Sequence, residues 1–397
     1  MKSHRKFRDF LLVSLHLGSN TCQFSIRWHS SLELLILLAS IRYESPARSP
    51  SIISSFSSVD NNLGGTLPSE LGHLTTLTYI ESIQNNISGP IPDSLQSLTN
   101  MRTFVMAHER MSGPLPSWLG TWVDMTFLYL SNNQFTGQLP DNMDQLRKLE
   151  VLSLDDNVLS GSIDKIWNLS NLEFVYMDQN DFTGALPTSI VSATPLLVNL
   201  DLSTNSIDGT LPTDLFELSN LEILDLHDNA ITGPLPVDPV ETANKMRFLT
   251  LHKNLLTQMI PAEFGLFKSL THLDLSTNKL TGTIPTQLEQ LVDLTYFFLA
   301  ENPLTEGPIP EFIYNYQELK ELNLKNTQRT GMIDEQVRKL QNLVLLDLDD
   351  NALTGNIPST IGRLDKLQFL LLNRNLLSGT VPTEMGNPPL LRKYCTG

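Results

Sequence analysis

Apolar and polar positions alternate in a regular way in residues 343–358, which read LVLLDLDDNALTGNIP. Leu346 and Leu348 are separated by one polar residue, which is the period of a strand with one buried face. Asn351 follows, and a buried Asn side chain can hydrogen-bond backbone groups that neighbouring turns of the chain leave unpaired. Gly355 permits a tight bend, and the closing Pro suits a return segment that needs no ladder donor. The segment therefore predicts a short strand, a polar turn and an irregular return.

Nearly the same pattern recurs roughly every 24 residues, a period in the range of repeat architectures. One such unit cannot bury its own leucines, but stacked units share a continuous core. We therefore predict one elongated solenoid of about fourteen units over residues 51–397, although a chain of 397 residues would otherwise suggest several domains. The slot of Asn351, called the ladder slot below, is filled in the other units by Asn61, Asn85, Glu109, Asn133, Asn157, Asn180, Asn205, Asn229, Asn254, Asn278, Asn302, Thr327 and Asn375.

Several units depart from the pattern. Glu109 has a carboxylate that cannot donate, so we expect its rung to be weaker or more open to water. The run of residues 304–307 carries one extra residue on a bend, where insertions are tolerated. In the next unit Thr327 replaces the Asn, Arg329 the following Leu and Asp334 the Pro, so we expect a local defect in that unit. Beyond residue 385 no polar closing helix is visible, which predicts an exposed edge on the last strand.

Residues 59–385 resemble the plant-type leucine-rich repeat family, whose pattern is LxxLxxLxLxxNxLxGxIPxxLGxL. Residues 270–291, LTHLDLSTNKLTGTIPTQLEQL, follow that pattern nearly slot for slot. The resemblance implies an α/β fold: a right-handed solenoid arc with a parallel sheet on the concave face and 3₁₀ or irregular segments on the convex side. It also implies binding of proteins, peptides or glycans, as in receptor-like ectodomains and inhibitors of wall-degrading enzymes. The family's paired Cys caps, a transmembrane helix and a kinase domain are absent, so a complete signalling receptor is not expected.

Residues 1–50 differ from the repeats. A basic start is followed by the apolar run 10–17, as in the first two regions of a signal peptide, and a second apolar run covers residues 32–39. Both runs are shorter than the roughly 20 residues of a transmembrane helix. We predict a targeting-like or disordered segment, with a helical cap on the first repeat as a further alternative. The predicted location is secreted or at the cell surface, and the alternative is cytoplasmic.

The net charge of −16 is unevenly distributed. Residues 1–50 hold seven Lys or Arg and three Asp or Glu, so the rest of the chain carries 20 against 40. Such an acidic surface repels phosphate backbones and anionic lipid, so we expect no nucleic acid and no membrane insertion by the repeats. A protein or peptide partner fits better, and the oligomeric state stays open. Cys22 and Cys395 lie at opposite ends of a long solenoid, which predicts two free thiols.

Strand alternation turns the residues beside the leucines toward the concave face. Aromatic residues recur there, which is typical of interface cores, although some could merely fill gaps between neighbours. Carboxylates recur in the middle of the face and would favour a basic patch on a partner, or would simply keep the face soluble. The predicted partner-binding residues are Tyr129, Phe174, Tyr176, Asp178, Asp201, Asp225, His227, Phe248, His252, Asp274, Tyr296 and Phe298.

His227 and His252 occupy one slot in consecutive units, beside Asp225 and with His272 one unit further. Such a group could ligate zinc, but nothing in the sequence fixes its geometry, and solvated histidines are the simpler interpretation. No Ser or Cys nucleophile has a motif nearby, and a shallow sheet lacks a water-excluding pocket. We therefore predict a non-catalytic recognition module without metal or cofactor. The alternatives are an intracellular scaffold or adaptor and an inhibitor of a secreted polysaccharide hydrolase.

Overall fold

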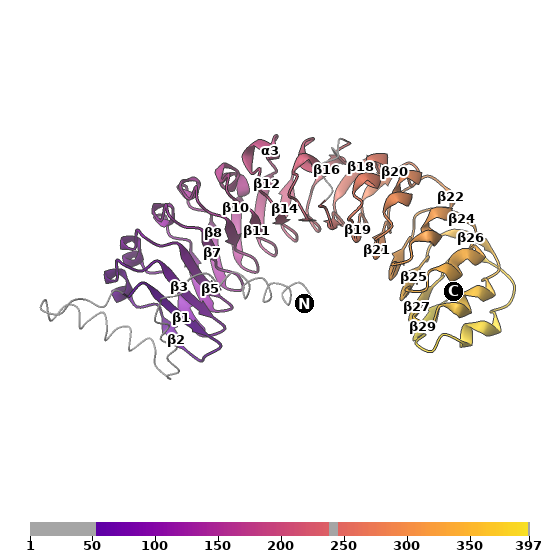
Figure 1. The fold of residues 1–397 in the computed structure, drawn as a ribbon, viewed down its shortest axis with the longest axis horizontal. Coiled ribbons are helices and arrows are strands. Elements are labelled where there is room, and N and C mark those ends of the chain that lie inside the picture. The colour runs from indigo at the N-terminus through magenta and orange to yellow at the C-terminus, as the bar shows by residue number, and fades with distance from the viewer. Residues whose placement is uncertain (1–52, 238–244, 396–397) are drawn as a thin grey trace, which may run out of the picture.

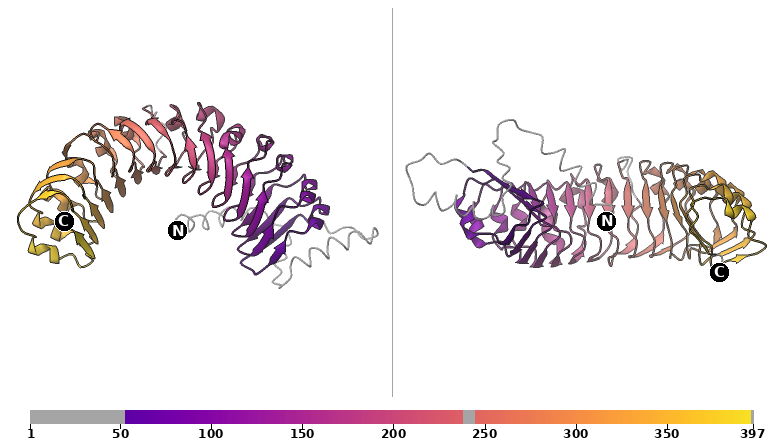
Figure 2. Two further views of the ribbon diagram at one scale, coloured as in Figure 1. Left: turned by 180° about the vertical axis from the view of Figure 1, so that it is seen from behind. Right: turned by 90° about the horizontal axis from the view of Figure 1, so that it is seen from below.

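The computed structural model describes residues 53–237 and 245–395 as one curved solenoid. Its concave side is a single fifteen-stranded parallel sheet, called the main sheet, with one strand for each turn of the chain (Figure 1). The arc is also visible from behind, and the strands of the main sheet are seen side by side from below (Figure 2). The strands are β1 (Ser55–Val59), β3 (Tyr79–Ile83), β5 (Thr103–Ala107), β7 (Phe127–Tyr129), β9 (Val151–Ser153), β11 (Phe174–Tyr176), β13 (Asn199–Asp201), β15 (Ile223–Asp225), β17 (Phe248–Thr250), β19 (His272–Asp274), β21 (Tyr296–Phe298), β23 (Glu321–Asn323), β25 (Leu345–Asp347), β27 (Phe369–Leu371) and β29 (Lys393–Cys395).

The core is a column of leucines shared by successive turns. Leu200, Leu224 and Leu249 are opposite one another on β13, β15 and β17, and all three are fully buried. One continuous cluster of such residues runs from Leu63 to Met385. Each turn therefore buries its leucines against the next turn, as the repeat predicts.

The ladder of Asn side chains is present and connects the turns. The amide of Asn205 accepts a hydrogen bond from the Phe182 backbone N–H at 2.9 Å, and it donates to the carbonyls of Met177 and Leu202. A rung of this kind satisfies backbone groups in its own turn and in the preceding one. In all fourteen units the residue before the ladder slot has a positive φ between 49° and 57°, so the chain turns sharply at that point.

Just after the ladder slot the structure adds strands that the sequence pattern does not predict. These strands form flank sheets, parallel sheets that run beside the main sheet. The first contains β2 (Gly64–Thr66), β4 (Asn86–Gly89), β6 (Arg110–Pro114), β8 (Gln134–Gln138), β10 (Val158–Ser162), β12 (Asp181–Ala185) and β14 (Ser206–Asp208). The second contains β16 (Thr232–Pro234), β18 (Leu255–Met259) and β20 (Lys279–Thr281), and the third contains β22 (Gly307–Pro308), β24 (Arg329–Met332), β26 (Ala352–Gly355) and β28 (Leu376–Leu377).

The convex side carries short helices, as the resemblance implies. Within the described residues all but α3 are short 3₁₀ helices, and seven of them begin directly after the Pro of the repeat. They are η1 (Ser69–His73), η2 (Asp93–Ser97), η3 (Leu119–Thr121), η4 (Met143–Gln145), η5 (Ile163–Asn168), α3 (Ile190–Ala193), η6 (Leu215–Glu217), η7 (Ala262–Leu266), η8 (Thr286–Gln290), η9 (Glu311–Asn315), η10 (Glu335–Lys339), η11 (Ser359–Arg363) and η12 (Thr383–Gly386). Within residues 53–237 and 245–395 no helix is both long enough and apolar enough to cross a bilayer.

The rung at Glu109 corrects one prediction. This side chain is only 7% exposed and is not open to water. Its carboxylate accepts hydrogen bonds from the Ser82 hydroxyl at 2.7 Å and from the backbone N–H groups of Asn85 and Ile87. Ser82 stands where other units have a strand leucine, and it supplies the donor that suits a carboxylate acceptor. The two departures from the repeat therefore compensate each other.

The ends of the chain complete the account of the fold. β29 pairs with β27, so the main sheet extends one strand beyond the fourteenth unit. Residues 1–50, with the predicted targeting segment and Cys22, lie outside the described residues. The predicted division at residue 51 therefore stays a prediction.

Candidate binding surface

Side chains on the concave face form three columns that cross the strands. The first column consists of the first residue of each strand, for example Asn199 of β13. The second column, which contains Asp201, lies two residues further along, and the third, which contains Ser203, lies two residues further again. Because the strands pair in register, each column places one slot of every repeat at strand spacing, roughly 4.8 Å apart.

One part of the first column is a stack of rings on β17, β19 and β21. The ring of His272 lies between those of Phe248 and Tyr296, with centroids 4.1 Å and 4.3 Å away. Phe298 meets Tyr296 edge to face at 6.2 Å, and the Arg247 guanidinium lies 5.8 Å from the Phe248 ring. The sequence predicts the three aromatic members of this cluster but misses His272 as the ring that joins them. Its slot, shared with Phe248 and Tyr296, is the signal that could have identified it.

The second aromatic group lies nearer the N-terminal half, on β7 and β11. Tyr129, Phe174 and Tyr176 are half-buried on the concave face. The Tyr176 hydroxyl accepts a hydrogen bond from the Asn199 side chain at 3.1 Å, and Asn199 is a contact that the sequence does not predict. Burial raises the pKa of the Tyr129 and Tyr176 hydroxyls well above the usual value for tyrosine. Both side chains therefore stay neutral donors and acceptors.

Carboxylates continue this group toward the middle of the arc. Asp155, 7% exposed, accepts a hydrogen bond from the Ser153 hydroxyl at 2.6 Å, and Asp201 accepts one from the Ser203 hydroxyl at 2.7 Å. Burial, together with the negative charge of Asp178, raises the pKa of Asp155 to about 7. Burial and the charges of Asp225 and Asp178 raise the pKa of Asp201 well above its usual value. These carboxylates therefore repel one another in a partly dehydrated environment.

Two stacked histidines follow at the centre of the third column. The rings of His227 and His252 lie 4.3 Å apart and are parallel to within 8°. Asp225 Oδ1 lies 2.6 Å from His227 Nδ1, and Asp274 Oδ2 lies 3.2 Å from His252 Nδ1. Burial tends to lower the pKa of His227, but the hydrogen bond and charge of Asp225 raise it overall. Burial and the neighbouring His227 lower the pKa of His252.

A metal centre is not formed by these histidines. In the part of the chain that the structure describes, no group of three or more His, Cys, Asp or Glu side chains is arranged to hold a metal ion. A carboxylate oxygen faces one nitrogen of each stacked ring, and His272 is part of the ring stack instead. The arrangement is better suited to hydrogen bonds with donors on another molecule.

The predicted binding residues do not converge on one point. Tyr129 on β7 and Tyr296 on β21 are seven strands apart, roughly 34 Å at the usual strand spacing. Tyr176, Asp178, Asp201 and Asp225 form one neighbourhood, and the His pair with the ring stack forms the next. An elongated ligand could contact both, whereas a small molecule could contact only one.

Comparisons with known proteins agree with this architecture. The family model of the leucine-rich repeat matches residues 124–146, 220–239, 269–291 and 342–364. Among solved structures, the plant peptide hormone receptor RGFR1 in complex with RGF2 is 32% identical, with a TM-score of 0.79 over 85% of this chain and 54% of that chain. The PEPR1–AtPEP1 structure is 33% identical, with a TM-score of 0.79 over 85% of this chain and 47% of that one.

A third solved structure is the Arabidopsis receptor kinase HAESA with the peptide hormone IDA and the co-receptor SERK1. It is 28% identical, with a TM-score of 0.73 over 86% of this chain and 61% of that chain. The chain spans about half the length of the first two receptors. No curated protein sequence matches closely enough to be counted as a relative.

Fold and repeats together define the class: the chain is a leucine-rich repeat solenoid. More narrowly, its repeats and fold are those of the plant-type leucine-rich repeat proteins, as the similarity to the RGFR1, PEPR1 and HAESA structures shows.

Proposed function

We propose that the chain is a non-catalytic recognition module that binds a protein or peptide along its concave face, outside the cell or at its surface. The observation that carries the proposal is a series of half-buried rings beside a run of carboxylates on a broad sheet. Within the described residues, elements pack only against their neighbours along the solenoid, so no part of that range covers the face. Rigid rings with polar edges are typical of the centres of interfaces.

The similar structures support a ligand of this kind. RGFR1 is described as a peptide hormone receptor in complex with RGF2, and HAESA was solved with a peptide hormone and a co-receptor. An extended peptide advances roughly 3.3 Å per residue, so about ten residues would span from Tyr129 to Tyr296. The carboxylates between these two tyrosines favour a partner that carries Lys or Arg there.

A triple variant tests the concave face. Tyr176→Ala, Asp201→Asn and Asp225→Asn together should abolish capture of a partner while the protein stays folded. The matched control is Asp293→Asn with Asp365→Asn, two exposed carboxylates in the turns that follow η8 and η11. Affinity capture by the full chain, with circular dichroism as the folding check, compares the two variants. Undiminished capture by the triple variant would remove the concave face from the proposal.

A second measurement tests the location. We expect residues 1–50 to direct secretion and the repeat domain to begin near residue 51. Expression in secretion-competent cells, followed by mapping of the mature N-terminus, decides this. An unprocessed protein found only inside the cells would favour the intracellular scaffold instead.

A further inference from the structure

The flank sheets are interrupted between β20 and β22, where several departures from the repeat meet. Pro303 follows the ladder slot directly, and in other units this residue donates its N–H to the preceding turn, as Ala230 does to Ile207. Proline has no N–H, so this bond is lost. The run 304–307 then holds one extra residue, and within the described ranges β20 and β22 are not paired.

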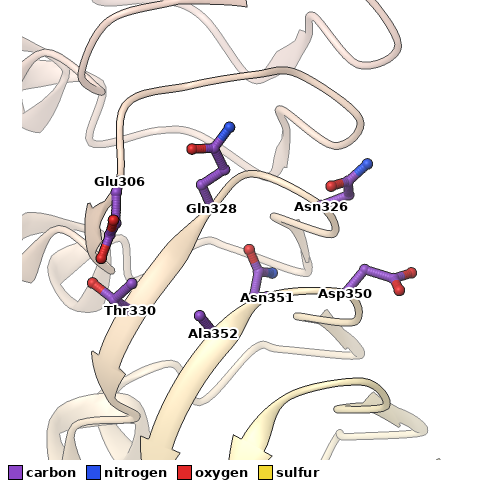
Figure 3. Close-up of a pocket in the computed structure, with 7 residues that line it drawn as sticks. All are labelled: Glu306, Asn326, Gln328, Thr330, Asp350, Asn351 and Ala352. Carbon is purple, nitrogen blue, oxygen red and sulfur yellow. The ribbon is translucent and has the colours of Figure 1, made fainter.

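Beside this irregular segment lies a hollow of about 330 Å³, at the bend between the main sheet and the third flank sheet (Figure 3). Pockets that hold small ligands usually measure roughly 300–1,000 Å³, so the hollow is at the small end of that range. Figure 3 shows Glu306 and Thr330 on one side and Asn326 and Asp350 on the other. The complete lining is Glu306, Asn326, Gln328, Thr330, Asp350, Asn351 and Ala352.

A buried arginine holds this irregular segment in place. Arg329 is 3% exposed and occupies a slot that other units fill with an apolar residue. Its guanidinium donates to the carbonyls of Thr305 at 2.5 Å, Thr327 at 2.8 Å and Pro308 at 3.3 Å. The Thr327 hydroxyl donates only to the Leu324 carbonyl of its own turn, at 2.6 Å, so the side chain in the ladder slot does not reach the preceding turn as an Asn does. The expected defect in the ladder is therefore present, and Arg329 bonds the surrounding carbonyls instead. Burying a cation is costly, which indicates that the segment is fixed rather than frayed.

The charges around the hollow are balanced. Asp350 pairs with Arg374, and Glu301 pairs with Lys325 at 2.7 Å. Glu306 carries the remaining negative charge at the surface, and the buried Arg329 carries a positive charge beneath it. A strongly cationic or anionic ligand is therefore not favoured at this site.

Two lining side chains are available to a ligand. Within residues 53–237 and 245–395, the carboxylate of Glu306 and the amide of Gln328 form no hydrogen bond or ion pair. A carboxylate accepts two hydroxyl hydrogens, and an amide both donates and accepts. Neighbouring hydroxyl groups on one ligand match such a combination, because each hydroxyl also donates and accepts.

We propose that the hollow lined by Glu306, Gln328 and Thr330 is a second binding site, which takes a neutral polyhydroxylated ligand of about one sugar residue. The site is separate from the concave face, so a partner and a sugar could be bound together. Because the hollow is shallow and offers a ligand only a few hydrogen bonds, binding is weak, in the millimolar range.

Titration of the full chain with maltotriose and xylotriose, followed by saturation-transfer NMR, tests the site. We expect at least one of these neutral sugars to bind, and trigalacturonate and trilysine not to bind at this site. Gln328→Ala and Glu306→Ala should each weaken binding roughly threefold to tenfold, the effect of one hydrogen bond. The matched control is Gln134→Ala, because Gln134 occupies the same repeat slot on β8 and is exposed.

Two substitutions by a bulky residue test the site without removing any hydrogen-bonding group. Ala352→Trp should fill the hollow and abolish binding, whereas Ala230→Trp, in the same repeat slot outside the hollow, should leave binding unchanged. Thermal melting confirms that each variant is folded. If neither neutral sugar binds, if the charged probes compete at this site, or if Ala352→Trp binds as the unmodified protein does, the proposal is wrong. The Tyr176, Asp201 and Asp225 variant should bind the sugar normally, so failure of one proposal is distinguishable from failure of the other.

Discussion

At the scale of the residue, the Gly slot of the repeat keeps a positive φ even where another amino acid occupies it. The Gly of the repeat has a positive φ in most units, for example 79° at Gly137. Gln258 stands in the same slot with a φ of 67°. A side chain in this region costs about 1–2 kcal/mol, because its Cβ approaches the following carbonyl oxygen. The solenoid therefore imposes the turn on Gln258.

Exchanging the residues in this slot should shift stability in opposite directions. Gln258→Gly should stabilise the protein by roughly 0.5–1 kcal/mol, since relief of strain exceeds the entropic cost of glycine. Gly137→Ala should destabilise it by about 1 kcal/mol; the added Cβ meets its nearest atom, the Pro114 Cβ, at an ordinary 3.6 Å, so only backbone strain acts. Thermal melting of both variants checks the pair. A lower melting temperature for Gln258→Gly would show that the Gln side chain itself stabilises the turn.

The buried carboxyl of Asp155 should make stability depend on pH in a known direction. Its pKa is raised to about 7 in the folded protein, above the value of roughly 3.9 in an unfolded chain. The native state therefore binds more protons between these two values, so this group lowers stability as the pH rises from about 4 to 7. Asp155→Asn should stabilise the protein at pH 8 by up to about 4 kcal/mol, and the gain should vanish near pH 4. Urea unfolding at several pH values measures the difference, and an equal gain at every pH would refute the ionisation account.

At the scale of the element, two substitutions in adjacent turns can each look unfavourable and yet stabilise each other. Ser82 and Glu109 each look unfavourable in the sequence, one in a leucine slot and the other in an Asn slot. They lie 27 residues apart, and only the stacking of β3 against β5 brings the hydroxyl to the carboxylate. The rung is therefore a property of two adjacent turns and not of either residue alone.

A double-mutant cycle on this pair should show strong coupling. Ser82→Leu restores the repeat pattern but removes a hydrogen bond from a buried carboxylate, so it should destabilise by roughly 1.5–3 kcal/mol. Adding Glu109→Asn, which restores the usual rung, should recover most of the loss. Denaturant unfolding of the two single variants and the double variant gives the coupling energy. If the two effects simply add, the compensation between Ser82 and Glu109 does not exist.

The sequence predicts those elements whose residue pattern is complete within one repeat unit. Leu346, Leu348 and Asn351 specify strand, core and rung by local spacing, and the structure confirms this pattern along the described chain. The flank sheets were not predicted, because segments such as Val158–Ser162 resemble a bend until the next turn supplies their partners. His272 was missed in the ring stack for the same reason, since its partners come from the two adjacent strands.

At the scale of the whole molecule, stacking in register converts single slots into continuous surfaces. An Asp in one unit contributes to an acidic surface only when its neighbours in the column are also acidic, as Asp201 and Asp225 are. Repulsion between such neighbouring carboxylates raises the free energy of the face when no partner is bound. A positively charged partner would relieve it, and this gives the acidic face a direct role in affinity.

Binding of a basic partner should therefore strengthen as the pH rises. Asp155, whose pKa burial and Asp178 raise to about 7, loses its proton between pH 5 and pH 8. Deprotonation of Asp201, whose pKa burial and neighbouring carboxylates raise, and of His227, whose pKa Asp225 raises, acts in the same direction. All three changes make the face more negative. We expect a peptide with central lysines to bind more tightly at pH 8 than at pH 5, with proton release on binding and weakening by salt. Calorimetry in two buffers of different ionisation enthalpy measures the released protons. The same peptide with glutamates in place of the lysines is the control, and tighter binding of the lysine peptide at pH 5 would contradict an electrostatic role for the carboxylates.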